Sequence, residues 1–262
     1  MVKRLVLLCV CLALTVGCGG RSGVSTEGST SMERVIGTLA EAFAAKTDIR
    51  VTYNPTGSGA GIQAVLSGRC DIGLSSRALT QAEQAQGLQT LLLAYDGIAL
   101  IVHPENPVRE MDLQSLAAVF TGEIDNWKML GGADAPIVPI GREAGGGTRD
   151  GFEAATNTVG RCKYRRELTS SGDIITTVSQ NPYAIGYVSA SAVKGNVTVL
   201  SVDGARPSKE ALQDGSYRIY RPFLLVYRTL DAQAQAFFDY VTSREAAGYI
   251  EAAGVVAAGG GA

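Results

Sequence analysis

The feature of this sequence that most constrains the fold is the stretch from Gly141 to Glu153, GREAGGGTRDGFE. Residues 136–140 (PIVPI) just before it are apolar and β-branched and predict a strand, whereas TRDGFEAA predicts a helix. A glycine run between a strand and a helix lets the backbone approach a ligand closely, because no Cβ intervenes. The helix then offers unpaired N–H groups and the positive end of its dipole. This combination is typical of a site for an anion.

Arg142 strengthens this interpretation, because a guanidinium can hold an oxyanion through two parallel hydrogen bonds. The stretch therefore predicts a pocket for a small tetrahedral anion. Two alternatives remain. The glycine spacing imitates a nucleotide-binding P-loop, although Gly147 occupies the position of the lysine. The stretch is also compatible with a flexible surface turn.

The same order of strand, glycine or hydroxyl residues and helix occurs twice more upstream. Gly28 is followed by three hydroxyl residues and an amphipathic helix from Met32 to about residue 45. One hydroxyl is enough for an N-cap, and three suit an anion. Residues 54–61 (NPTGSGAG) follow a predicted strand at 49–53, and Ser75 and Ser76 follow a third at 71–74. We therefore expect an α/β fold with its ligand groups at the carboxyl ends of strands.

Composition narrows the function. The 262 residues are 46% hydrophobic and 18% charged, which suits one large domain or two smaller ones. A net charge of −2 gives no indication of nucleic acid as a partner, so an anion must be attracted by a few oriented groups. The chain has one histidine and no metal-ligand spacing, which argues against a zinc site or a histidine-based catalytic triad.

The N-terminus predicts export. Lys3 and Arg4 precede an apolar run at residues 5–16, which is too short for a transmembrane span and typical of a signal peptide. Residues 1–17 are thus expected to be removed, leaving Cys18 as a lipidated first residue in a context similar to a lipobox. Residues 18–26 are expected to be a tether. We predict a protein anchored by lipid (palmitate) on the extracytoplasmic face of the cell membrane.

Three features away from the glycine-rich stretches also give predictions. Residues 91–102 (LLLAYDGIALIV) predict a buried strand or pair of strands, in which Asp96 either takes part in a turn with Gly97 or lies near the pocket as a carboxylate. An amphipathic helix is expected from residue 231 to about 253. Residues 257–262 (AAGGGA) are expected to be a disordered tail.

Eight motifs in order give the chain a family resemblance: EGSTSM, NPTGSGAGI, DIGLSSRAL, AYDGIA, FTGEIDNW, IGREAGGGTRDGF, NPYAIGYVS and RPFLLVY. Over residues 27–256 the chain resembles the phosphate-binding lipoproteins of bacterial ABC phosphate importers. The resemblance implies a two-lobed periplasmic-binding-protein (clamshell) fold with two crossing strands. Lobe one would comprise residues 27–97 and 217–256, and lobe two residues 98–216.

The resemblance also implies the residues that bind phosphate. Lobe one would supply Ser29, Thr30 and Ser31, together with Ser58 and Ser76; lobe two would supply Arg142, Gly146, Gly147 and Thr148. Because each lobe holds half of the donors, we expect the ligand to favour a closed form. Cys70 and Cys162 would lie in different lobes and are expected to be free thiols.

This chain departs from the family pattern at two positions. Many members have serine where Gly146 stands, and some have aspartate where Ser76 stands. A carboxylate at the second position accepts the proton that phosphate carries and sulfate lacks. Here that role must fall to another group, such as Ser76 itself, Asp96 or Glu143.

The resemblance predicts a monomeric binding protein without cofactors or catalytic residues that delivers inorganic phosphate to a membrane permease. One alternative keeps the fold but binds sulfate or molybdate. Another is an exported phosphatase that uses Ser58 or Ser76 as nucleophile, against which the single histidine and the missing metal ligands argue. A signalling role, in which a sensor recognises the closed form, is a further alternative.

The lipid anchor can be tested by changing Cys18. Cells that express the chain should incorporate a palmitate analogue into it, and a Cys18→Ala variant should not, because the thiol that carries the lipid is gone. Gel fluorescence of the purified proteins measures this. Equal labelling of both proteins would contradict the prediction.

Overall fold

The computed structural model describes residues 23–258, so the predicted signal peptide, Cys18 and the last four residues lie outside the described part. Within residues 23–258 the chain forms one ten-stranded mixed sheet in the order β2-β1-β3-β11-β4-β8-β6-β7, with β12 and β9 paired to β4. A short parallel pair, β5 and β10, lies apart from it. The α/β fold class predicted from the sequence is confirmed.

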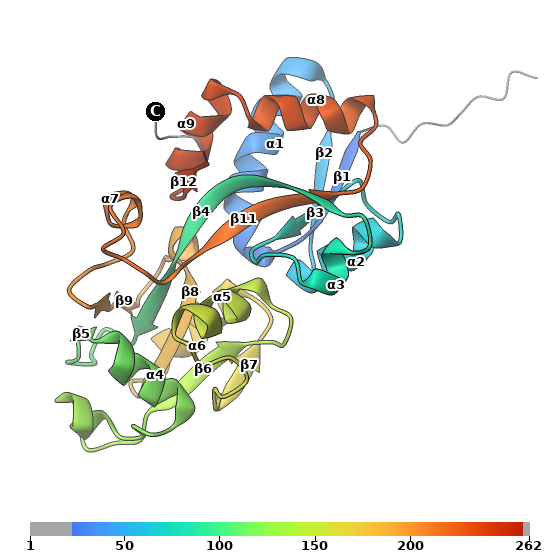
Figure 1. Cartoon of the computed structure of the whole chain (residues 1–262). Coiled ribbons are helices and arrows are strands. Elements are labelled where there is room, and N and C mark those ends of the chain that lie inside the picture. Colours follow the sequence, from blue (N-terminus) through green and yellow to red (C-terminus); the bar gives the residue numbers. More distant parts are fainter. Residues whose placement is uncertain (1–22, 259–262) are drawn as a thin grey trace, which may run out of the picture.

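The molecule is divided into two groups of elements, and Figure 1 shows β4 and β11 running between them. We call them the first and the second lobe. The first lobe contains β1 (Val24–Gly28), β2 (Val51–Pro55), β3 (Ile72–Ser75), β11 (Tyr220–Tyr227), β12 (Val256–Ala257), the 3-10 helix η1 (Thr30–Met32), α1 (Glu33–Thr47), α2 (Ser58–Leu66), α3 (Gln81–Gln84), α8 (Ala232–Val241) and α9 (Arg244–Ala252).

The second lobe follows along the chain, after β4 (Gln89–Val102). It contains β5 (Glu110–Met111), α4 (Leu113–Thr121), the 3-10 helix η2 (Trp127–Leu130), β6 (Val138–Arg142), α5 (Gly147–Ala155), β7 (Arg166–Leu168), α6 (Ser171–Ser179), β8 (Ala184–Ser189), the 3-10 helix η3 (Ala190–Ala192), β9 (Thr198–Val199), β10 (Ser201–Val202) and α7 (Lys209–Gln213).

Strand β4 belongs to both lobes. It pairs antiparallel with β11 from Gln89 to Gly97 and then with β8 from Ile98 to Val102. Its change of partner therefore falls at Gly97. The predicted lobe boundaries stay a prediction. Because β4 continues from one lobe into the other, it fixes the position of the two separately packed lobes relative to each other.

Helices cover both faces of the sheet, because its strands are apolar on both sides. In the first lobe, Phe43 of α1 and Phe237 of α8 meet edge to face at 5.3 Å in one core, and α2 packs on the opposite face with Ile62 and Val65. In the second lobe the corresponding helices are α4 and α5 on one side and α6 on the other. Trp127, which is 1% exposed, completes the core beneath α4.

The structure corrects the predicted ends of the fold. The tether predicted over residues 18–26 is too long, because Val24–Gly28 forms strand β1, which pairs with β2 and β3. The side chain of Val24 is buried there, with 1% exposure. The disordered tail predicted from residue 257 also begins too early, since Ala257 pairs with Ala94 in β12. In both cases a short strand is stabilised by pairing with strands far away in the sequence.

Two internal predictions are corrected as well. The closing helix predicted from residue 231 to 253 is two helices, because Ser243 caps a new one through a bond from the Ala246 N–H. Asp96 takes no part in a turn; it lies in the middle of β4 and is fully buried. No helix among residues 23–258 is long and apolar enough to span a bilayer.

Candidate anion-binding site

The site is built where strands of both lobes end. β1 ends at Gly28 and leads to Ser29, and β3 ends at Ser75 and leads to Ser76. β1 and β3 are parallel, so their carboxyl ends meet at the same edge of the sheet. In the second lobe β6 ends at Arg142. The nine predicted residues therefore lie at the ends of a few strands or in the segments that follow them.

A cluster of three serines forms the first-lobe side. Ser29 Oγ donates to Ser76 Oγ at 2.8 Å, and Ser58 Oγ lies 3.1 Å from Ser76 Oγ. The Ser76 N–H donates to Ser58 Oγ at 3.0 Å. All three side chains are buried, with at most 2% exposure. Ser29 also caps η1, because its Oγ accepts a bond from the Ser31 N–H, as expected of a hydroxyl before a helix.

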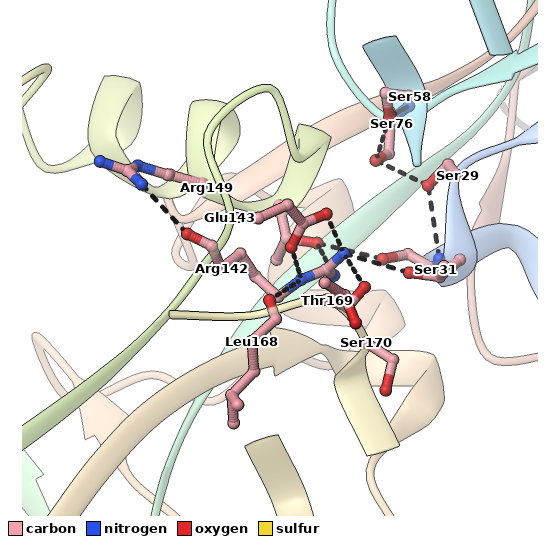
Figure 2. A network of polar contacts seen from close by, with 12 residues as sticks. Ser29, Ser31, Ser58, Ser76, Arg142, Glu143, Arg149, Leu168, Thr169 and Ser170 are labelled. Carbon is pink, nitrogen blue, oxygen red and sulfur yellow. Dashed lines mark hydrogen bonds and ion pairs between the residues drawn. The ribbon is translucent and has the colours of Figure 1, made fainter. Parts of the chain in front are cut away.

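Arg142 forms the second-lobe side together with the start of α5. Its guanidinium is buried and donates from Nη1 to Thr148 Oγ1 and from Nη2 to Thr30 Oγ1, both at 3.3 Å. The carbonyl oxygens of Leu168 and Thr169 also accept from it. Figure 2 shows Arg142 and Glu143 on one side and Ser29, Ser58 and Ser76 on the other.

The second-lobe core holds Arg142 in place. The Arg142 N–H donates to the Tyr187 hydroxyl at 3.2 Å, and the Tyr187 ring stacks on Phe152 of α5 at 4.1 Å between centroids. Burial raises the pKa of Tyr187, so its hydroxyl stays protonated and donates in turn to Tyr164. The start of α5 and the end of β6 are thereby fixed relative to each other.

Glu143 balances the charge of Arg142. Its two carboxylate oxygens accept from Nε and Nη2 of Arg142, each at 2.8 Å, which is a bidentate ion pair. The carboxylate also lies beside the glycine loop, since a Cβ on Gly146 would be 3.0 Å from Glu143 Oε1. A serine at position 146 would crowd this carboxylate.

The N-terminus of α5 faces the serine cluster at very short range. A Cβ on Gly147 would overlap Ser76 Oγ and lie 2.5 Å from Ser58 Oγ, so only glycine fits here. No side chain caps this helix, and the N–H groups of Gly147 and Thr148 open it without partners inside the helix. The backbone of one lobe therefore meets the hydroxyls of the other.

Further contacts hold the two lobes together. Ser31 Oγ lies 3.1 Å from Thr148 Oγ1, and Arg77 Nε lies 3.0 Å from Asp150 Oδ2 in α5. Burial raises the pKa of Asp150, and the Arg77 guanidinium opposes that rise. Arg77 also pairs with Glu83 and keeps the pKa of that carboxyl low, at about 2. The lobes are therefore in contact across the site.

A pocket of about 430 Å³ opens beside the cluster rather than inside it. Thr30, Ser31 and Arg34 line it from the first lobe, and the start of α6 and Lys194 line it from the second. It borders Thr30 and Ser31 of the site. Arg34 and Lys194 give its lining two basic side chains against one acidic side chain, Glu33, and this small excess of positive charge favours the approach of an anion.

All nine predicted residues thus lie together, and sequence reasoning missed one further residue. Arg221 of β11 donates from Nη1 to Ser76 Oγ at 3.3 Å and forms a fully buried ion pair with Asp96. An arginine inside the otherwise apolar strand at residues 219–227 (IYRPFLLVY) was the available indication. Burial raises the pKa of Asp96, while the adjacent Arg221 opposes the rise.

Comparison with known proteins agrees with this geometry. Residues 18–245 match the model of the PBP superfamily domain, and the phosphate-binding protein PstS of Bacillus subtilis is 30% identical over 85% of this chain and 76% of its own. The chain belongs to the PBP superfamily and, within it, to the phosphate-binding proteins.

Solved structures give the same result. A protein described as a phosphate ABC transporter substrate-binding protein, with bound phosphate, from Clostridium perfringens is 38% identical with a TM-score of 0.87, covering 90% of this chain and 99% of its own. An ABC-type phosphate transport receptor from Vibrio cholerae is 31% identical with a TM-score of 0.75, covering 90% and 100%. The family and the fold therefore agree with a site that binds an anion.

The close approach at Gly147 can be tested by Gly147→Ala. The added methyl group should keep the lobes apart, because it would overlap Ser76 Oγ. Small-angle scattering with saturating phosphate should give a larger radius of gyration than for the unchanged protein. Gly248→Ala is the control, since a Cβ on this residue of α9 would have no other atom within 4 Å. Identical scattering from both variants would contradict the prediction.

Proposed function

We propose that this protein binds inorganic phosphate between its two lobes and delivers it to the membrane permease of an ABC importer, without chemical conversion. The observation that supports this most is the convergence of Arg142, the start of α5 and the serine cluster on one point between the lobes. The guanidinium of Arg142 and the opening N–H groups of α5 are hydrogen-bond donors, and a serine hydroxyl can also donate, which is what an anion with four oxygens needs when it leaves water.

The charged residues around the site are paired, so we attribute the affinity for the anion to hydrogen-bond donors rather than to net charge. Arg142 pairs with Glu143, and Arg221 pairs with Asp96. The anion is therefore attracted by oriented N–H and O–H groups and by the dipole of α5. This agrees with a chain whose net charge is −2.

Glu143 is the group proposed to distinguish phosphate from sulfate. Asp96 is unsuited to this role, because it is fully buried and Ser189 and Arg221 already donate to its oxygens. The side chain of Glu143 is 29% exposed and its carboxylate borders Gly146, so the free lone pairs of the carboxylate can face an anion at the start of α5. It would accept the proton that phosphate carries and repel a fully deprotonated sulfate.

We further propose that the protein acts as a monomer outside the cytoplasmic membrane, anchored by lipid at Cys18, as the family resemblance and the N-terminal sequence imply. In that position it captures the anion and presents it to the permease. Lobe closure around the ligand gives the permease a form to recognise.

The ligand is tested by calorimetric titration of the delipidated protein with phosphate and, separately, with sulfate at pH 7. We expect phosphate to bind and Arg142→Met to weaken it by about 2–5 kcal/mol, because a buried charged donor is lost. Arg109→Met is the control, since that guanidinium donates to the backbone carbonyls of Pro104 and Val108. If sulfate binds as tightly as phosphate, the proposed site stands and the proposed specificity for phosphate is wrong.

The role of Glu143 predicts a change of selectivity in Glu143→Gln. The amide keeps the size but loses the charge, so phosphate should bind more weakly by about 1.5–3 kcal/mol while sulfate binds no worse. Glu123→Gln is the control, because this exposed carboxylate accepts from Thr121 outside the site. If the phosphate-to-sulfate ratio stays the same in Glu143→Gln, another group accepts the proton.

A further inference from the structure

The hydrogen bonds around Ser76 leave its hydroxyl a single role. A hydroxyl oxygen has one hydrogen to donate and two lone pairs to accept. Ser76 Oγ accepts from Ser29 Oγ at 2.8 Å and from Arg221 Nη1 at 3.3 Å, so both lone pairs are used. Ser76 is therefore a donor in its 3.1 Å contact with Ser58 Oγ.

The consequence passes on to Ser58. Its Oγ accepts from the Ser76 N–H at 3.0 Å and, by the argument above, from the Ser76 hydroxyl. Only its hydrogen then remains available. Ser58 Oγ lies next to the position where a Cβ of Gly147 would be, at the open start of α5. The hydrogen of Ser58 is thus directed at the place where the two lobes meet.

Arg221 is held rigidly enough to impose this direction. Its Nε and Nη2 donate to Asp96 Oδ2 at 3.1 and 2.9 Å, across the paired strands β4 and β11. Asp96 is itself fixed by Ser189 of β8, whose Oγ donates to Oδ1 at 2.7 Å. From the second lobe α5 packs on the arginine stem, since a Cβ on Gly151 would lie 3.1 Å from Arg221 Cβ.

We propose that Arg221, held by Asp96, is a positioning residue of the anion site: through Ser76 it makes Ser58 a hydrogen-bond donor toward the anion. Ser58 then presents a donor from the first lobe, so an unprotonated phosphate oxygen faces Ser58, and the protonated one faces Glu143 in the second lobe. Hydrogen bonds in such a chain polarise one another, which strengthens the last donor. The inference rests on the proposed function, because it concerns the same site.

A double-mutant cycle with phosphate titration tests whether Arg221 acts through Ser76. The arginine is changed together with its partner, Asp96→Asn with Arg221→Met, so that no buried charge is left unpaired. In the protein with Ser76 we expect phosphate binding to weaken about tenfold or more. In the Ser76→Ala background the same change should weaken it less than about threefold, because residues of one network are not additive.

A second variant makes the test independent of how the double change folds. Arg221→Lys keeps the charge for Asp96, but one ammonium cannot reproduce the three bonds of the guanidinium to Asp96 and Ser76. It should unfold cooperatively on heating and still show the weakened phosphate binding, again only when Ser76 is present. Arg228→Lys is the control, because it is the same arginine-to-lysine change in an exposed guanidinium that donates to the Gln86 carbonyl, outside this network. Its effect should be the same with and without Ser76.

The outcomes separate this inference from the proposed function. Equal weakening by the Arg221 changes in both backgrounds would overturn the inference and leave phosphate binding intact. If the unchanged protein binds sulfate and not phosphate, the proposed ligand is wrong, and the same cycle run with sulfate decides the role of Arg221. If it binds neither anion, both proposals fall.

Discussion

An anion that leaves water must find hydrogen-bond donors on all sides, and this requirement explains the arrangement of the molecule. Few side chains from one segment can surround four oxygens. The donors that we propose come from the ends of β1, β3 and β6 and from the first residues of α2 and α5. Two lobes in contact supply opposite sides of one site, which no single helix or loop could do.

The crossing strands make this convergence possible. β4 pairs with β11 in the first lobe and with β8 in the second, so one strand carries the register of both. The ion pair of Asp96 and Arg221 lies where these strands meet, and it reaches Ser76 on one side and Ser189 on the other. A buried pair of this kind gives little net stability compared with apolar residues. Its contact with Ser76 at the site gives the pair a role other than stability.

The balance of charges fits binding that is specific rather than merely strong. Each of the two buried arginines has its own carboxylate, Glu143 for Arg142 and Asp96 for Arg221. The arginines are thereby oriented, and the site does not rely on an excess of positive charge. A carboxylate beside such oriented donors can distinguish anions by where their protons lie, because it accepts a hydrogen bond from a protonated oxygen and repels an unprotonated one.

The sequence by itself determined the local features: glycine runs and hydroxyls between strand and helix, the buried strand at residues 91–102, and an arginine before the glycine loop. These depend on neighbours along the chain, which periodicity and residue type record. Only the tertiary structure decided that Val24 lies inside the sheet, that Asp96 is paired, and that Arg221 reaches Ser76. Arg221 and Ser76 are 145 positions apart, and Arg221 and Asp96 are 125. A sequence pattern shows that a residue is buried, but the partner of a buried charge is set by which strands pair, and that is fixed only when the whole sheet has formed.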